Sequence, residues 1–555
     1  MPTHTGPGTS KVQQEDRRSI TDLTISVSFS KPSVSAQASR WRSTEFRFYA
    51  VAFALVVPMM VYIPMRYSSQ TNLNYMLYAW RLSPGWIFGW KVDNSDHQYH
   101  TFRSGLPSLV LLAALHLASS SLARRFSSTS ETKIRIGAGL SIGILFILHG
   151  LSTIKILIIL AGNYAAAKWT KPETLDKFWP GMVVVGNMGI LFLNERFEGY
   201  PLARIHPALT WLDQVSGVLP RWHINFNITM LRLVSFSLDY HWRRQANTTT
   251  TPPMDYRSRV TSLLEDDAYS PAGYLAYCLY PPLYIAGPIM TFNDFIWQQR
   301  QPVTITPREK LSYAIRFASC LLTMELILHT MYVVAIKDSS AWNGAGPAQL
   351  CMIGFWNLVV VWLKLLIPWR FFRLWALLDG IDPPENMIRC VANNYSTLGF
   401  WRSWHRSYNL WIVRYIYVPL GGSRNVIPST LLVFTFVALW HDLSFKLLAW
   451  GWLVSLFILP ELLGRRLVSS KQYGDRWWYR HVAALGGVCN ILMMMSANLV
   501  GFVLGLEGLR HLLTELATPA GIIFTIFASC CLFIAVQVMF EYREEELRKG
   551  IDRKC

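Results

Sequence analysis

Charged residues are scarce in this sequence. Asp, Glu, Lys and Arg supply 15% of the 555 residues, whereas hydrophobic residues supply 52%. Because soluble domains carry about a quarter charged residues, this shortage favours a membrane protein over a string of soluble domains. The chain also carries 23 Trp, 24 Tyr and 29 Phe, as expected for aromatic belts at two membrane–water boundaries.

Cysteines at metal-binding or redox spacing are absent as well. The eight cysteines form no CxxC pattern, and most lie in apolar runs. This spacing argues against a disulfide framework and against a zinc site, so we expect no metal site. The residues near Met1 lack the apolar run of a signal peptide. The Ser/Thr-rich residues 1–44 are therefore expected to form a disordered cytosolic tail.

A separate basic domain is also missing, although the formal net charge is +18. The arginines lie between apolar runs, which does not favour nucleic acid as a partner. Positive residues on the cytosolic side of a membrane, attracted to anionic head groups, explain the pattern. An anionic cosubstrate is compatible with the same distribution.

The apolar runs predict an all-α polytopic membrane protein with about ten transmembrane helices. The expected spans are 48–62, 106–122, 136–161, 178–193, 313–336, 351–367, 426–443, 445–462, 482–503 and 522–540. Residues 45–541 would then form one transmembrane domain, and residues 542–555 a charged cytosolic tail. The basic residues beside the spans place both termini in the cytosol.

Three other apolar segments are too polar or too broken to span. Residues 222–244 mix apolar and charged side chains at helical spacing, which predicts an interfacial helix in the membrane plane. Residues 274–290 contain Gly287 and Pro288 and are expected to form a re-entrant element that lines a cavity, because irregular backbone at membrane depth needs protein or water around it. Residues 393–417 are expected to be re-entrant or buried in protein.

Two histidines lie in or beside this apolar sequence. His441 follows the run VFTFVALW, and His405 follows Trp404. An ionisable group at membrane depth is costly and indicates function. A histidine in an apolar setting stays neutral, with the free lone pair that a general base requires. A hydrogen-bonded structural histidine gives the same pattern, so the residues alone leave both interpretations open.

The run FWRSWHRSYNLWIVRYIYVPLGG, followed by a span that ends in LWHD, resembles the membrane-bound O-acyltransferase (MBOAT) family. The resemblance covers roughly residues 140–510 and is strongest at 390–460. It implies an MBOAT-type helical bundle. It also implies that His441 occupies the catalytic position and that His405 is its upstream partner.

Three further stretches, GNMGILFLNERFEG, YLAYCLYPPLYIAGPIMTFNDF and DGIDPPENMIRC, resemble the fungal glycerol-uptake-protein subgroup, which is related to Hedgehog acyltransferases. This resemblance implies an enzyme of the endoplasmic reticulum membrane that uses acyl-CoA. The implied acceptor is the lyso-lipid of a glycosylphosphatidylinositol (GPI) anchor. Hedgehog acyltransferases tend to have Asp at the position of His405, which argues against palmitoylation of a protein amine.

The expected chemistry is proton transfer to and from an acceptor hydroxyl. His441 would take the proton as the hydroxyl attacks the acyl thioester, and His405 would orient a partner or stabilise the developing negative oxygen. Trp404, Trp440 and Asp442 are expected to line the site. Asp442 could fix the imidazole tautomer or could instead cap the helical hairpin.

Other candidates concern the donor and its acyl chain. Guanidinium groups suit the phosphates of coenzyme A, although each arginine alone could simply set topology; we expect phosphate contact from at least two. The candidates are Arg370, Arg373, Arg402, Arg406 and Arg414. Tyr284 and Gly287 are expected to line the acyl tunnel or only to break a helix. Cys390 is inert packing, or, from the Hedgehog resemblance, a haem thiolate or an S-acylation site. No cofactor is required.

The alternative function is a multi-pass glycerol–proton transporter. It would also explain membrane histidines and broken helices. Transporters often contain paired inverted repeats with matched broken segments, and no such repeat is visible in the sequence. A scaffold that only positions other lipid enzymes is a third interpretation.

Overall fold

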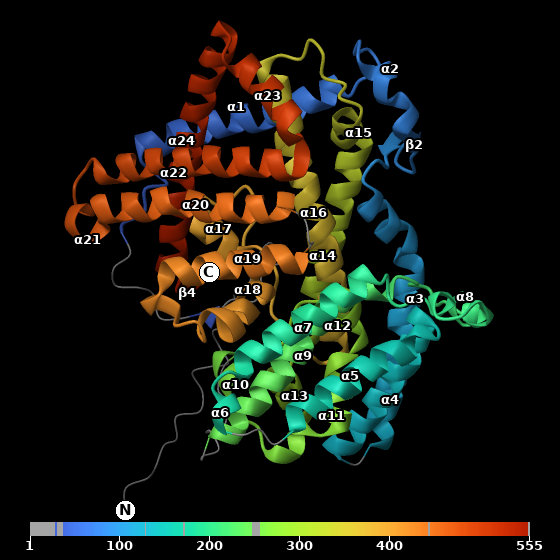
Figure 1. Cartoon of the computed structure of the whole chain (residues 1–555). Helices are drawn as coiled ribbons and strands as arrows, with labels where there is room; N and C mark the ends of the chain where they lie inside the picture. Colours follow the sequence, from blue (N-terminus) through green and yellow to red (C-terminus); the bar gives the residue numbers. More distant parts are fainter. Residues whose placement is uncertain are drawn as a thin grey trace, which may run out of the picture.

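The computed structural model describes residues 28–29, 37–127, 129–169, 173–246, 256–441 and 445–552, and its regular structure is mainly helical (Figure 1). Its strands are short. β1 (Ser28–Phe29) pairs with β4 (Ile551–Asp552), and β2 (Leu82–Pro84) pairs with β3 (Lys91–Asp93).

Seven helices in the described ranges are long and apolar enough to cross a membrane. They are α1 (Thr44–Tyr67), α3 (His97–Phe126), α4 (Ser130–His149), α14 (Pro307–Thr330), α16 (Pro347–Asp379), α22 (Tyr479–Asn498, whose span continues to Gly501) and α24 (Pro519–Arg548). The predicted all-α multi-pass fold is confirmed. The expected number of about ten spans exceeds these seven, partly because α19 (Val426–His441) has only 16 residues.

The remaining helices connect and surround these spans. They are α2 (Tyr75–Tyr78), α5 (Ser152–Lys168), α6 (Glu173–Asp176), α7 (Trp179–Arg196), α8 (Thr210–Gln214), α9 (Trp222–Gln245), α10 (Tyr256–Thr261), α11 (Pro271–Cys278), α12 (Pro281–Ile285), α13 (Phe292–Arg300), α15 (Val333–Asp338), α17 (Thr397–Ser403), α18 (Arg406–Ile412), α20 (Phe445–Leu467), α21 (Ser470–Tyr473) and α23 (Gly505–Leu516).

The apolar run at 136–161 is two helices, so the prediction of a single span there is wrong. α4 ends at His149, and α5 begins at Ser152. Between them Gly150 adopts φ +55°, and a Cβ on this residue would lie 2.2 Å from the carbonyl oxygen of Val215. Only glycine fits this close approach, and the approach ends the first helix.

Helix α9 is not an interfacial helix. Its residues 229–239 are all buried, and it packs against α5, α7 and α13. Two of its charged side chains have partners inside the protein: the guanidinium of Arg232 donates to the carbonyl oxygen of Cys278 at 2.8 Å, and Asp239 accepts from Arg414 at 2.7 Å. The prediction for 222–244 is wrong because a mixed apolar and charged helix can also be buried when its charges are paired.

The segment 274–290 is irregular and surrounded by protein. α11 and α12 are separated by two residues, and most of the segment is buried. Residues 393–417 are likewise packed in the interior: α17 and α18 lead into a π-helical turn at Val413–Tyr417, which contacts α9 and α19. The π-helical turn thus links α19 to α9.

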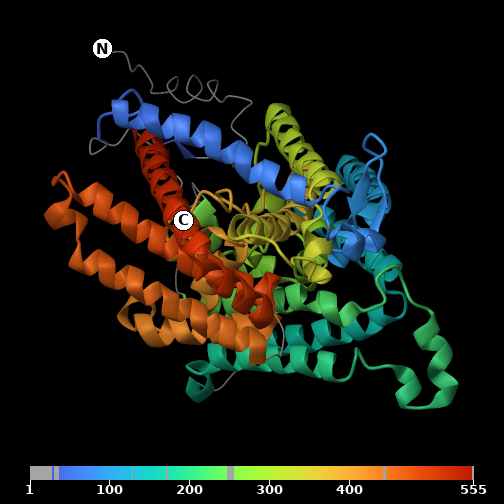
Figure 2. The ribbon, with the colours of Figure 1, turned by 90° about the horizontal axis from the view of Figure 1, so that it is seen from above.

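The two ends of the described chain lie together. The backbone N–H of Gln37 donates to Glu544, and Arg548 donates to the carbonyl oxygen of Gln37. α24 continues to Arg548, beyond the predicted domain boundary at residue 541. Viewed from above, α1 and α24 meet at one edge of the molecule (Figure 2).

Candidate active site

A large, mostly apolar cavity lies among α1, α16, α18, α19, α22 and α24. Its volume is about 1610 Å³, and both His405 and His441 line it. Trp404 and Trp440, the tryptophans that precede these histidines, line it too. The structure therefore brings together two histidines that are 36 residues apart in the sequence.

Tyr408 lies between the two imidazoles. Its ring centroid is 5.3 Å from that of His405 and 6.3 Å from that of His441. The buried Tyr408 hydroxyl has no hydrogen-bond partner among the described residues. Sequence reasoning missed this residue, although its place three residues after His405, on the first turn of α18, was a usable signal.

The backbone of His405 is held in an unusual conformation. Its φ of +45° lies in the left-handed region, which non-glycine residues seldom occupy. Asn386 holds the next residues: its carbonyl oxygen accepts from the N–H of Arg406 at 2.9 Å, and its side-chain oxygen accepts from the N–H of Ser407 at 3.2 Å. Such strain persists only where surrounding contacts impose it, and it is common at functional sites.

The imidazole of His405 packs against Trp369 of α16, with centroids 4.7 Å apart and planes 17° apart. His405 lies outside the seven spanning helices. Desolvation inside the protein, with a further effect of the neighbouring His441, lowers the pKa of His405 to about 3. The ring is therefore neutral at neutral pH and can donate or accept one hydrogen bond.

His441 is the last residue of α19, and its side chain is exposed to the cavity. Two hydrogen bonds hold the preceding Trp440. Its indole donates to the carbonyl oxygen of Asn227 at 3.0 Å, and the Asn227 amide donates to the Trp440 carbonyl oxygen at 3.3 Å. Helix α9 thus fixes the end of α19. Asp442, predicted beside His441, lies outside the described residues.

Comparison with known proteins shows the family of the chain. The family model of the membrane-bound O-acyltransferases matches residues 211–506, which include both histidines. The chain belongs to the MBOAT family. It is similar to "Membrane-bound O-acyltransferase GUP1" of Saccharomyces cerevisiae, with 46% identity over 94% of this chain and 95% of that protein. The corresponding protein of Candida tropicalis is 45% identical over 95% of this chain and 92% of its own length.

A more distant relative is the mouse "Protein-cysteine N-palmitoyltransferase HHAT". It is 29% identical over 58% of this chain and 68% of that protein. The family and these relatives identify the chain as a membrane-bound acyltransferase. The predicted family and class of enzyme are confirmed.

Of the five predicted arginines, only Arg402 lines the cavity, and it is exposed. Arg373 is buried and pairs with Asp382 at 2.7 Å. Arg414 pairs with Asp239 at 2.7 Å, and Arg370 contacts the Cys320 sulfur at 2.9 Å. Arg406 is half-buried outside the cavity. Contact of these arginines with coenzyme A stays a prediction, and the ion pairs give Arg373 and Arg414 a structural role.

Tyr284 and Gly287 do not line the large cavity. The Tyr284 hydroxyl is 2.9 Å from Nε2 of His149, which is itself hydrogen-bonded to the carbonyl oxygen of Leu219. A Cβ on Gly287 would lie 2.5 Å from the carbonyl oxygen of Pro282. Of the two predicted roles, the break in the helix fits this packing.

Cys390 is exposed and lines neither this cavity nor a smaller one between α3 and α4. The described residues include no group of three or more His, Cys, Asp or Glu side chains arranged to hold a metal ion. The haem and S-acylation interpretations of Cys390 therefore stay predictions, and the chemistry below uses neither.

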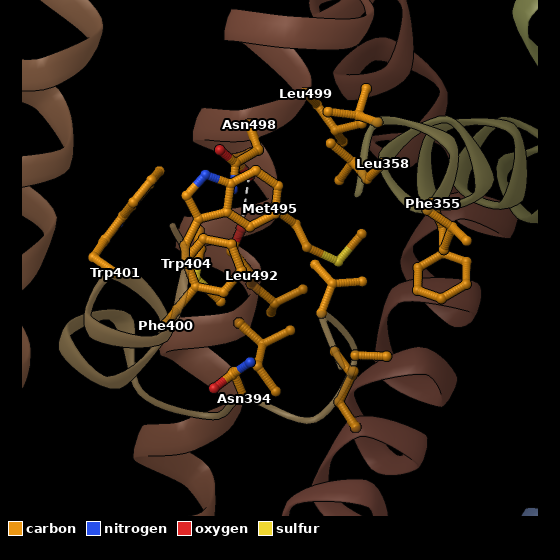
Figure 3. Close-up of a pocket in the computed structure, with 18 of the residues that line it drawn as sticks. Phe355, Leu358, Asn394, Phe400, Trp401, Trp404, Leu492, Met495, Asn498 and Leu499 are labelled. Atoms are coloured by element: carbon orange, nitrogen blue, oxygen red, sulfur yellow. Dashed lines mark hydrogen bonds between the residues drawn. The ribbon is translucent and has the colours of Figure 1, made fainter. Parts of the chain in front are cut away.

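One wall of the cavity combines aromatic and polar side chains that the sequence did not single out (Figure 3). Phe400 and Trp401 of α17 lie beside Trp404, and Met495 and Asn498 of α22 lie nearby. An asparagine inside an apolar run was the available signal for Asn498, since polar groups at membrane depth indicate function.

Proposed function

We propose that this acyltransferase moves a fatty acyl group from acyl-CoA to the hydroxyl of a lipid, the lyso-lipid of a GPI anchor, in the endoplasmic reticulum membrane. One observation carries the proposal: His441 and His405 line the same large apolar cavity. An apolar cavity suits acyl chains, and a pair of neutral imidazoles suits proton transfer from a hydroxyl.

The chemistry is acyl transfer from sulfur to oxygen. His441 takes the proton of the acceptor hydroxyl as its oxygen attacks the thioester carbonyl, which becomes a tetrahedral oxyanion. His405 or the Tyr408 hydroxyl donates a hydrogen bond to that oxyanion. The carbon–sulfur bond then breaks, and the proton held by His441 passes to the departing thiolate. The products are an ester and free coenzyme A.

Cavity size supports two lipid-like substrates. Pockets for single small ligands hold roughly 300–1,000 Å³, whereas this cavity holds about 1610 Å³. Arg402 is placed at its wall, where a guanidinium could contact a phosphate of the donor. The remaining wall is mainly aliphatic and aromatic, which suits acyl chains.

The choice of acceptor rests on similarity. The two GUP1 relatives are named O-acyltransferases and match nearly the whole chain, whereas the relative named for N-palmitoylation matches 58% of it. Together with His405 in place of the Asp expected in Hedgehog acyltransferases, this favours an oxygen acceptor over a protein amine.

The test uses purified full-length protein in liposomes with radiolabelled acyl-CoA. Three arms run in parallel: a GPI lyso-lipid, a peptide with an amino-terminal cysteine, and glycerol flux under a proton gradient. The proposal predicts label in the GPI lipid alone, and loss of that label in His441→Gln. Label in the peptide would show that the acceptor is a protein amine rather than a lipid hydroxyl. Glycerol flux without acyl transfer would instead support the transporter.

A further inference from the structure

A second cavity lies apart from the histidines. Its volume is about 270 Å³, and it is formed by one end of α3, the first half of α4, α13, the start of α14 and the last turn of α16. The side that contains it holds Arg124, which the distribution of basic residues predicts to be cytosolic. Its wall carries three cationic side chains: Arg124, Lys133 and Lys310.

The one carboxylate in this wall is already satisfied. Asp379 Oδ1 accepts from Ser120 at 2.6 Å and from Arg124 at 2.7 Å, and its Oδ2 accepts from Tyr280 at 2.7 Å. Throughout the described ranges, no carboxylate lies within ion-pairing distance of Lys133 or Lys310. The cavity therefore keeps two lysines that form no direct ion pair, which favours an anion.

A histidine adds a neutral donor to the same wall. Nδ1 of the buried His116 accepts a hydrogen bond from the Trp375 indole at 3.1 Å. A neutral imidazole that accepts at Nδ1 carries its proton on Nε2. His116 lines the cavity, so this wall offers an N–H donor beside the ammonium groups.

Other residues of the wall are apolar. Ile134, Leu140 and Leu378 line it, and Gly137 opens it further, because a Cβ on that residue would contact nothing within 4 Å. A site that combines cationic and aliphatic side chains suits a phosphate attached to a lipid. A volume of about 270 Å³ holds a head group but falls below the range for a drug-sized ligand.

We propose that this cavity binds the phosphate of an anionic phospholipid, separately from the acyl-transfer site. Lys133 and Lys310 contact the phosphate oxygens, His116 donates to one of them, and the aliphatic wall along α4 packs against the glycerol and upper acyl carbons. Basic pockets between membrane helices on the cytosolic side are suited to such head groups.

The test measures retention of radiolabelled phosphatidylinositol by the purified full-length protein in neutral detergent, with phosphatidylcholine as the comparison lipid. Lys133→Gln/Lys310→Gln should lower retention of phosphatidylinositol about tenfold, since each lysine near a charged lipid contributes measurably. Phosphatidylcholine retention should not change. Gly137→Leu, which fills the cavity and removes no charge, should also lower phosphatidylinositol retention.

The matched control is Arg125→Gln/Arg135→Gln. These residues are exposed neighbours on α3 and α4, and the variant loses the same charge outside the cavity. Equal loss in this control, or unchanged retention in both cavity variants, would overturn the proposal. Displacement by millimolar inorganic phosphate would assign the site to free phosphate, and displacement by free coenzyme A would assign it to the acyl donor; either result would show the lipid assignment to be wrong.

Discussion

The imidazole of His405 stacks on the indole of Trp369, with ring centroids 4.7 Å apart, while its own backbone adopts φ +45°. The ring packs on a membrane-spanning helix, and Asn386 holds the backbone of the two residues that follow. A strained residue fixed from two sides is pre-organised, and the strain must be offset by these contacts.

Substitutions at His405 should separate the effect of its backbone strain on stability from the effect of its imidazole on the acyl-transfer rate. Asparagine tolerates the left-handed region, alanine costs roughly 1–2 kcal/mol there, and a β-branched side chain costs more. We therefore expect thermal stability to fall in the order His405→Asn, His405→Ala, His405→Val. Because the asparagine amide can still donate to an oxyanion, acyl transfer should fall roughly tenfold in His405→Asn and about 100-fold in His405→Ala. Equal stability of the Val and Asn variants would contradict this account.

Asn227 should affect the rate more than the fold. Its side chain donates to the Trp440 carbonyl oxygen, one residue before His441. Asn227→Ala removes a hydrogen bond worth about 1 kcal/mol, and the end of α19 can then shift. A small displacement of a reacting group can lower a rate up to about 100-fold. Parallel measurements of the melting temperature and the transfer rate check this. A loss of stability that fully explains the lost rate would count against it.

Two arginines should respond differently to the same change. Arg402 is exposed at the cavity wall, whereas Arg414 pairs with the buried Asp239. Arg414→Gln leaves a buried carboxylate without its cation, which costs about 3–5 kcal/mol. Arg402→Gln should leave stability unchanged and raise the KM for acyl-CoA several-fold, as expected for a lost phosphate contact. Steady-state kinetics with varied acyl-CoA and thermal unfolding distinguish the two outcomes. The opposite pattern would exclude Arg402 from donor binding.

The sequence predicted the two histidines of the cavity better than their surroundings. His405 and His441 could be found because titratable groups in apolar sequence are rare and costly. Trp369, which stacks on His405, and Asn386, which binds the two residues after His405, could not, since hydrophobic periodicity does not connect separate segments of the chain. The prediction for α9 was wrong for the same reason. Arg232 and Asp239 indicated a surface helix, because the carbonyl and arginine groups that bind them lie on distant elements. Gly150 gave no distinct signal within its apolar run.

The C-terminal helix should be required for folding rather than act as a free tail. Arg389 and Glu546 form a two-fold hydrogen-bonded ion pair, at 2.9 and 2.7 Å, and both side chains are buried. Glu546→Gln should destabilise the protein by about 3–5 kcal/mol, because a buried guanidinium loses its counter-charge. The exchange Arg389→Glu/Glu546→Arg should restore part of that loss. Thermal unfolding of the three variants checks this, and equal stability of Glu546→Gln and the unmodified protein would refute it.

The most direct measurement is the acyl-transfer rate of purified His441→Gln in liposomes with acyl-CoA and a lyso-lipid acceptor. The account predicts a rate at least about 100-fold lower than that of the unmodified protein, with an unchanged melting temperature, because the general base is lost. His97→Gln, at an exposed histidine that does not line the cavity, serves as the control and should keep its rate. A His441→Gln rate close to that of the unmodified protein would contradict the assignment of this histidine as the catalytic base.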